Sequence, residues 1–209
     1  MGEYALGQPI PRSEDPRLLS GGGRYVDDVQ LPNTARGWIL RSPFAHANIK
    51  SIDTSTAEAV PGVLLILTGK DWEECGWGDL PVGSGRKRPD GSPMFVPPMK
   101  PIVTDGRVRR VGDYVAMVIA DTENQAKDAC ELIDVDYEML PSVTSGKKAL
   151  AEGAPAVFDE CPDNICFLHE VGDKEAVDAA FAQADHVTNH KLNITRVMAA
   201  TIEPRGCTA

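Results

Sequence analysis

Apolar positions divide the chain into short stretches whose spacing predicts alternating strands and helices. Continuous apolar runs or strict alternation predict strands over residues 34–41, 48–53, 63–68, 115–120 and 134–138. The runs 63–68 and 115–120 are almost wholly apolar, so we expect both to be buried strands. Asp53 and Thr54 precede 55–60 as possible caps of a short helix. This order of elements predicts a compact domain of mixed helix and sheet over roughly residues 18–145.

Two longer helices follow from the period of 3.6 residues. The first begins at a capping box, with Thr122 as N-cap and Gln125 three residues later. Its apolar face is formed by Ala126, Ala129, Cys130 and Ile133. A second helix starts at Asp173, with an apolar stripe at Val177, Ala180, Phe181 and Ala184. Alternation over 187–195 predicts a further strand.

Three stretches lack such periodicity. Residues 1–33 are rich in Gly, Pro and charge and predict an extended arm with a flexible turn at Gly21–Gly23. Residues 69–100 form a long irregular stretch, which inside a compact domain is usually functional or mobile. Residues 146–170 have loop composition and are the candidate domain boundary. We therefore expect an arm over 1–17, a domain over 18–145, a linker over 146–170 and the start of a second domain over 171–209.

Composition excludes several classes of protein. The 209 residues carry a formal net charge of −10, a poor match for phosphate backbones, so nucleic-acid binding is not expected. No apolar run approaches about 18 residues, so no membrane span is expected, and the first residues lack the features of a secretory signal. Five cysteines are an odd and sparse set, which favours reduced thiols in a cytoplasmic protein.

Few side chains could carry chemistry. Cys161, Cys166 and His169 have the spacing C-x4-C-x2-H, one ligand short of the usual four-ligand zinc site, so loop thiols are the favoured interpretation and metal binding the alternative. His186 and His190 lie four apart without the Glu of an H-E-x-x-H motif and are expected to be surface histidines. The basic cluster of residues 86–88 is expected to be a solvated loop tip rather than an anion site. No phosphate-binding loop or nucleophile elbow occurs, so no catalytic site can be assembled from the residues alone.

A series of segments, taken in order, resembles one family. The segments are Gly23-Arg24-Tyr25-Val26-Asp27-Asp28, Arg41-Ser42-Pro43-Phe44-Ala45-His46-Ala47-Asn48-Ile49, Pro61-Gly62-Val63, Thr68-Gly69-Lys70-Asp71, Val111-Gly112-Asp113-Tyr114-Val115-Ala116, Ala126-Lys127-Asp128-Ala129, Val135-Asp136-Tyr137-Glu138-Met139-Leu140-Pro141, Asn164, Gly172-Asp173 and Glu203-Pro204-Arg205-Gly206. They resemble the N-terminal part of the large, molybdenum-binding subunit of the xanthine dehydrogenase/aldehyde oxidase family, in particular its carbon monoxide dehydrogenase branch. The resemblance extends over nearly the whole chain.

The resemblance implies an α+β fold, in which 18–145 form the α/β hammerhead domain and 171–209 begin the first molybdopterin-binding domain. It implies a molybdenum hydroxylase that acts on an aldehyde, a purine or N-heterocycle, or carbon monoxide, with water as the oxygen source. The implied cofactors are molybdopterin cytosine dinucleotide in the complete large subunit, with [2Fe–2S] clusters and FAD on partner chains. The implied partners are an iron–sulfur small subunit, an FAD medium subunit and the rest of the large subunit.

The family's pterin- and molybdenum-binding segments have no counterpart among these residues. Glu203 belongs to a different motif from the family's catalytic glutamate, so no catalytic, cofactor-binding or metal residue is assigned and the chain alone is expected to be inactive. Two other functions stay open. One is a non-catalytic structural or assembly partner of such a complex, and the other is an unrelated metal- or ligand-binding domain, which zinc binding lost on Cys161→Ser would favour. The loop 69–100 is the candidate contact with a partner or substrate channel, and the start of the second domain is expected to leave an apolar helix face uncovered.

Overall fold

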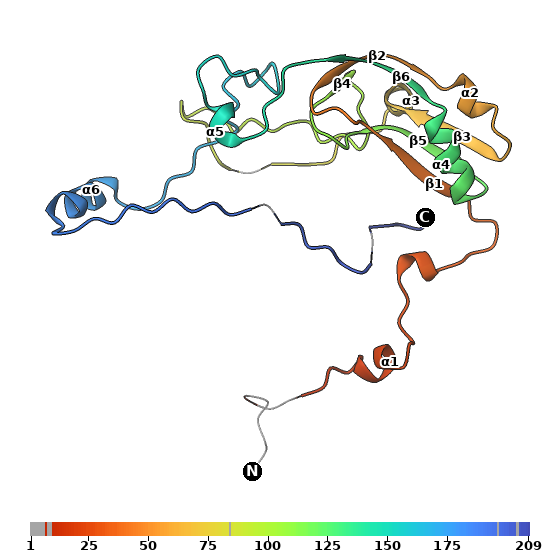
Figure 1. Ribbon diagram of the computed structural model, residues 1–209, viewed down its shortest axis with the longest axis horizontal. Coiled ribbons are helices and arrows are strands. Elements are labelled where there is room, and N and C mark those ends of the chain that lie inside the picture. The colour runs from red at the N-terminus through yellow and green to blue at the C-terminus, as the bar shows by residue number, and fades with distance from the viewer. Residues whose placement is uncertain (1–6, 8–9, 84, 196, 204) are drawn as a thin grey trace. The chain divides into compact units, whose positions relative to one another are not determined.

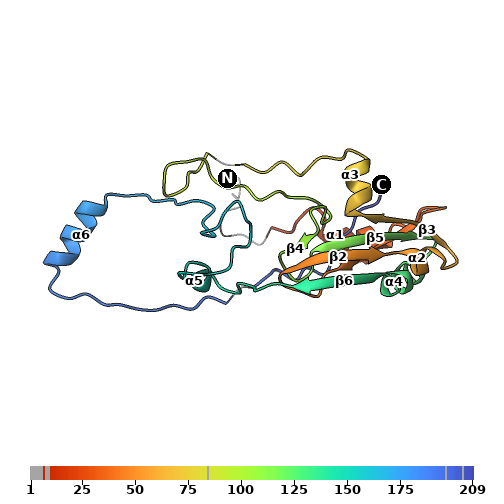
Figure 2. The same cartoon turned by 90° about the horizontal axis from the view of Figure 1, so that it is seen from above.

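The computed structural model describes residues 7, 10–83, 85–195, 197–203 and 205–209 (Figure 1). The chain divides into two compact units, residues 35–185 and residues 1–34 with 186–209. The larger unit contains two three-stranded antiparallel sheets, seen from two sides in Figures 1 and 2. Within the described residues, no helix has both the length and the apolar character needed to cross a membrane.

The first sheet has the strand order β1-β5-β3, with β1 at Arg36–Arg41, β5 at Tyr114–Ala120 and β3 at Val63–Thr68. The central strand β5 is mostly buried, as its apolar run predicts. The prediction that all of 63–68 is buried is wrong, because Leu64 and Leu65 are both exposed. The register of β3 against β5 shifts between Val63 and Leu65, and such an irregularity interrupts the alternation of side chains between the two faces.

The second sheet has the order β4-β2-β6, with β2 at Ala47–Asp53, β4 at Arg107–Val108 and β6 at Asp134–Met139. His46 holds the end of this sheet together. Its carbonyl accepts from the amide of Leu140 at 2.9 Å, and its Nδ1 lies 2.8 Å from the carbonyl oxygen of Pro141. The predicted strands 48–53 and 134–138 are both confirmed.

Helix α4 at Glu123–Glu131 packs against the strands of the first sheet (Figure 1) and begins at the predicted N-cap, Thr122. The reciprocal half of the predicted capping box does not form, because the Gln125 side chain accepts from the Thr122 hydroxyl and donates to the carbonyl of Pro61 instead. The Thr122 hydroxyl accepts from the amide of Gln125 at 3.3 Å. Ala126, Ala129, Cys130 and Ile133 are all buried in the main core, as the periodicity predicts. The shorter helix α2 at Ser55–Glu58 buries Ala57 in the same core and ends two residues before the predicted limit.

Helix α3 at Gly69–Glu74 begins the stretch predicted to be irregular. The start of this helix is determined by neighbouring residues. Asp71 accepts from both the amide and the hydroxyl of Thr68, at 2.7 and 2.6 Å. The hydrogen bond from Thr68 holds the pKa of the Asp71 carboxyl below its ordinary value. The expectation of an irregular stretch over 69–100 is therefore wrong for its first six residues, where a capping box supplies the helix start.

Two helices follow β6. Helix α5 spans Gly146–Ala149, and α6 spans Lys174–Gln183 with Asp173 as its N-cap, whose carboxylate accepts from the amide of Ala176 at 2.9 Å. The helix predicted from Asp173 thus forms, but it buries no residue, and Val177 and Phe181 are exposed as expected for an uncovered apolar face. The boundaries expected at 146–170 remain a prediction.

The smaller unit contains helix α1 at Asp15–Leu19 and the 3-10 helix η1 at Val26–Asp28. An extended arm over 1–33 is therefore wrong for these residues. Gly21 has φ +77°, and its amide closes the end of α1 on the carbonyl of Leu18. The strand predicted over 187–195 does not form, because within the described chain no neighbouring strand pairs with it and alternation alone cannot replace that ladder.

Candidate functional site

The third residue of the predicted loop tip at 86–88, Arg88, is half-buried and anchors the loop to a distant segment. The Arg88 side chain is only 16% exposed and reaches three groups 73 to 77 residues further along the chain. Its Nη2 donates to Asp163 at 2.6 Å, and its Nη1 donates to the carbonyl of Ile165 at 2.7 Å and to Cys161 Sγ at 3.1 Å. These contacts raise the pKa of Arg88 above its ordinary value and hold the pKa of Asp163 below its own. The expectation of a solvated tip is therefore wrong for Arg88, because its guanidinium donates to a carboxylate, a carbonyl and a thiol sulfur of a distant segment.

The three residues considered for metal binding share this neighbourhood without forming a ligand set. Cys161 is 2% exposed, Cys166 is half-buried and His169 is exposed. Burial is the largest cause raising the pKa of the Cys166 thiol. Within the ranges that the structure describes, no group of three or more His, Cys, Asp or Glu side chains is placed to hold a metal ion.

Two further arginines hold the segment before Cys161. Arg107 Nη1 lies 3.0 Å from both carboxylate oxygens of Asp159. Arg109 donates to the carbonyl of Val157 at 3.1 Å and stacks over the ring of Phe158 at 4.5 Å. Residues 157–159 are thereby attached to the strand β4 and its extension.

Asn164 shapes the same segment from inside. It adopts φ +57°, a left-handed conformation that Asn tolerates, and its side chain makes three hydrogen bonds to the backbone of Val157, Ala149 and Pro155. The sequence singled out Asn164 only as one of the residues of the resemblance. No local signal could show that Arg88 reaches Asp163, because the two lie 75 residues apart.

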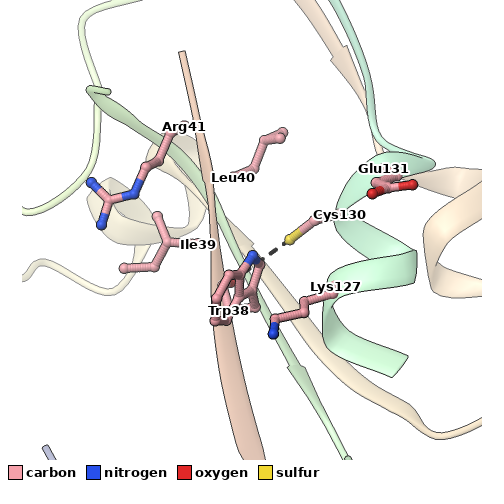
Figure 3. Close-up of a pocket in the computed structure, with 7 residues that line it drawn as sticks. All are labelled: Trp38, Ile39, Leu40, Arg41, Lys127, Cys130 and Glu131. Carbon is pink, nitrogen blue, oxygen red and sulfur yellow. Dashed lines mark hydrogen bonds between the residues drawn. The ribbon is translucent and has the colours of Figure 1, made fainter. Parts of the chain in front are cut away.

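A pocket of about 360 Å³ lies beside the edge strand β1 and helix α4 (Figure 3). Lys127 stacks over the ring of Trp38 at 4.2 Å, and Cys130 Sγ lies 3.8 Å from the carbonyl oxygen of Trp38. Burial raises the pKa of the Cys130 thiol to about 11, which leaves it protonated and unreactive at neutral pH. The rest of the lining consists of apolar and charged side chains, namely Ile39, Leu40, Arg41 and Glu131. The pocket therefore offers a packing surface rather than a set of catalytic groups.

The remaining candidates lie in the smaller unit. His186 and His190 are exposed, in a segment that is neither helix nor strand, and His186 Nε2 lies 3.1 Å from the Thr188 hydroxyl. The Glu203 carboxylate accepts from the amide of Val26 at 3.0 Å, across 177 residues of sequence. Glu203 and Gly206, from one segment of the resemblance, thus lie close to Val26 of another, and Glu203 has a backbone partner there.

Comparison with known proteins agrees with this fold. Residues 20–141 match the family described as aldehyde oxidase and xanthine dehydrogenase, a/b hammerhead domain. The chain is 36% identical to the carbon monoxide dehydrogenase large chain of Afipia carboxidovorans and 35% identical to the nicotine 6-hydroxylase large subunit of Paenarthrobacter nicotinovorans. Each alignment covers 98% of this chain but only 25% and 24% of the relative, so the chain spans about a quarter of their length.

Solved structures give the same result. The crystal structure of a Cu,Mo carbon monoxide dehydrogenase matches with a TM-score of 0.67 and 36% identity, over 86% of this chain and 23% of that one. The aldehyde oxidoreductase of Desulfovibrio gigas matches with a TM-score of 0.61 and 31% identity, over 84% and 19%. An unrelated metal-binding domain is therefore set aside, and the chain belongs to the aldehyde oxidase and xanthine dehydrogenase family, whose a/b hammerhead domain it contains.

Proposed function

We propose that this chain is a section of the large subunit of a molybdenum hydroxylase. The observation that carries the proposal is the alignment of 98% of the chain with the carbon monoxide dehydrogenase large chain at 36% identity. The complete enzyme would oxidise or hydroxylate a small substrate, with water as the oxygen source. The substrate class stays open among aldehydes, purines or N-heterocycles and carbon monoxide, since relatives named for nicotine, carbon monoxide, hypoxanthine and aldehydes match over this same region.

The described residues offer no set of side chains suited to bind molybdenum directly. The described side chains include no cluster that could hold a metal ion, and the pocket beside β1 is lined by Trp38, Lys127 and other packing residues. We propose that this chain is inactive alone. Its role is packing and shape: the two sheets would cover the pterin-binding domains and help to line the substrate channel.

The proposed cofactors and partners follow the family. Molybdopterin cytosine dinucleotide would be held by the rest of the large subunit, with [2Fe–2S] clusters and FAD on a small and a medium subunit. Relatives described as large subunits, and one described as subunit gamma of a dehydrogenase complex, support a multi-subunit assembly. A cytoplasmic location remains a prediction from the cysteine usage.

The test is to express the gene that encodes these residues, together with its neighbouring genes, in a host that makes the molybdenum cofactor. Molybdenum and iron are measured by mass spectrometry, flavin by absorbance, and CMP after acid hydrolysis of the purified complex. We expect molybdenum and CMP near one per large subunit, and residues 1–209 expressed alone to carry neither. A large subunit that assembles with its partners but contains no molybdenum would overturn the proposal.

The alternative is a non-catalytic structural or assembly chain of such a complex, favoured by the lack of a metal-binding cluster within the described residues. In that case a polypeptide of about this size would copurify as a separate chain beside a large subunit that holds the molybdenum. Denaturing gel electrophoresis of the purified complex distinguishes the two functions.

We also propose that loop 69–100 contacts a partner chain, and a test of this contact must leave the fold of the loop intact. Neutralising residues 86–88 together would also remove the Arg88 anchor, so weakened assembly could result from a disturbed fold. The double variant Arg86→Gln/Lys87→Gln keeps that anchor. We expect it to weaken assembly with the partner chains on gel filtration, and unchanged assembly would rule out a contact through these two side chains.

A further inference from the structure

Two distant segments of the larger unit form one small substructure. The first, residues 86–95, turns back on itself: the Arg88 amide donates to Ser92 at 2.9 Å and the Met94 amide to Arg86 at 3.1 Å. The second, residues 157–168, pairs with it through Phe95 to Cys166 and Leu168 to Lys87, both at 2.9 Å. We call these two segments together the strap.

Inside the strap, Arg88 is the central contact. Its guanidinium joins the first segment to Asp163, Ile165 and Cys161 of the second. The rings of Phe95 and Phe158 lie 5.4 Å apart, which adds an aromatic contact between the segments. Cys161 is the buried thiol of this substructure, and Arg88 Nη1 lies against its sulfur.

The strap is attached to the sheets mainly by polar contacts. Arg107 contacts Asp159, and Arg109 contacts Val157 and Phe158, through a carboxylate, a backbone carbonyl and an aromatic ring. Among the described residues, neither cluster of buried apolar side chains contains a member of the strap. Regions with few buried apolar contacts open at lower free energy than the core of the same protein.

We propose that the strap opens as a unit without unfolding of the sheets, and that Arg88 holds it closed. Cys161 is sealed from solvent only in the closed form. A group attached to its sulfur would occupy the position of the Arg88 guanidinium, which lies 3.1 Å away. A disulfide reagent that forms a mixed disulfide with the Cys161 sulfur, with cleavage of its own S–S bond and release of a thiolate, therefore traps the strap open, which makes the strap a conformational switch sensitive to thiol–disulfide exchange.

The two buried thiols allow a direct test, because Cys161 lies in the strap and Cys130 in the main core. The background Cys75→Ser/Cys166→Ser/Cys207→Ser, in the chain of 209 residues, leaves these two alone. The probe is the aromatic disulfide 5,5′-dithiobis(2-nitrobenzoate). The deprotonated Cys161 sulfur attacks one sulfur of the reagent, a mixed disulfide forms, the original S–S bond breaks and a coloured thiolate leaves.

The protection factor of each thiol is its labelling rate in urea-unfolded protein divided by its labelling rate in native buffer. We expect Cys161 to be at least about tenfold less protected than Cys130, and Arg88→Met to raise its labelling by about 10- to 100-fold, the range for losing hydrogen bonds to a charged group. Cys130 should change little in that variant. Lys87→Met, which removes a neighbouring exposed cation but keeps the backbone pairing, should change the Cys161 rate by less than about twofold.

Equal protection of Cys161 and Cys130, falling together in Arg88→Met, would overturn the proposal, since the strap would then open only by global unfolding. If Arg88→Met does not fold, the urea dependence of the triple-Ser background decides. Labelling of Cys161 that is nearly independent of low urea, while that of Cys130 rises steeply, supports local opening. The same steep dependence at both thiols contradicts it.

Discussion

Gly69, the first residue of α3, leaves no room for a side chain. A Cβ there would lie 1.9 Å from the carbonyl oxygen of Val103 and 2.8 Å from the Thr104 Cα, and both are backbone atoms that cannot rotate away. Gly69→Ala must therefore displace the chain around Val103. That movement breaks the hydrogen bond from the Val103 amide to Tyr114 at 2.8 Å and disturbs the buried Ile102. A lost hydrogen bond of about 1 kcal/mol and an overpacking cost of about 1–3 kcal/mol give an expected loss of about 2–4 kcal/mol.

The matched control is Gly78→Ala, where nothing lies within 4 Å of the added Cβ and the backbone is not left-handed. This substitution should be neutral or slightly stabilising, because alanine restricts the unfolded chain. Urea unfolding, followed by the fluorescence of the three tryptophans, measures both variants against the parent chain. The same urea midpoint for Gly69→Ala and Gly78→Ala would refute the packing described for α3.

Three further predictions concern the core. Thr122→Ala should lower the free energy of unfolding by about 1 kcal/mol in urea unfolding, whereas Thr122→Ser, which keeps the oxygen that accepts from Gln125, should not; equal losses would contradict the cap. Burial raises the pKa of Cys130 from an ordinary value of 9.0 to about 11, so the unfolded chain loses its proton first as the pH rises, and stability should fall between about pH 9 and 11. Cys130→Ala should remove that part of the pH dependence in thermal unfolding at a series of pH values, and an unchanged slope would assign it to other groups. His46→Phe should cost about 1–3 kcal/mol by leaving the Pro141 carbonyl without its partner, and a stability equal to the parent's would show that this bond contributes nothing.

The elements of the larger unit could be predicted because their signals are local. The N-cap Thr122 and the apolar face through Ala126 and Ala129 lie within or next to one helix, so neighbouring residues alone define it. The continuous apolar run of β5 likewise indicates a mostly buried strand, and β5 is the central strand of its sheet, with β1 and β3 at its two edges.

The errors occur where the outcome depends on a distant partner. Alternation over 187–195 gave the expectation of a strand, but a strand needs a neighbour, and none pairs with that segment in the described chain. Leu64 and Leu65 were expected to be buried because their run is apolar, whereas the position of β3 at a sheet edge and its register shift decide their exposure. An apolar run does not by itself show whether its strand lies at the centre or the edge of a sheet, or in which register it pairs.

The candidate site shows the same dependence for charged residues. The cluster at 86–88 has the composition of a solvated loop, and Lys87 is indeed exposed. Arg88 differs because Asp163 and the carbonyl of Ile165 fold back onto it from 75 and 77 residues away. Loss of the half-buried Arg88 guanidinium should cost more than loss of a surface cation, because it leaves the carbonyl of Ile165 without this donor, whereas the exposed Asp163 carboxylate can be hydrated. The contribution of a basic residue to stability therefore depends on the segment that packs over it. Charge replacements in this loop consequently test contacts with partner chains only when Arg88 is left in place.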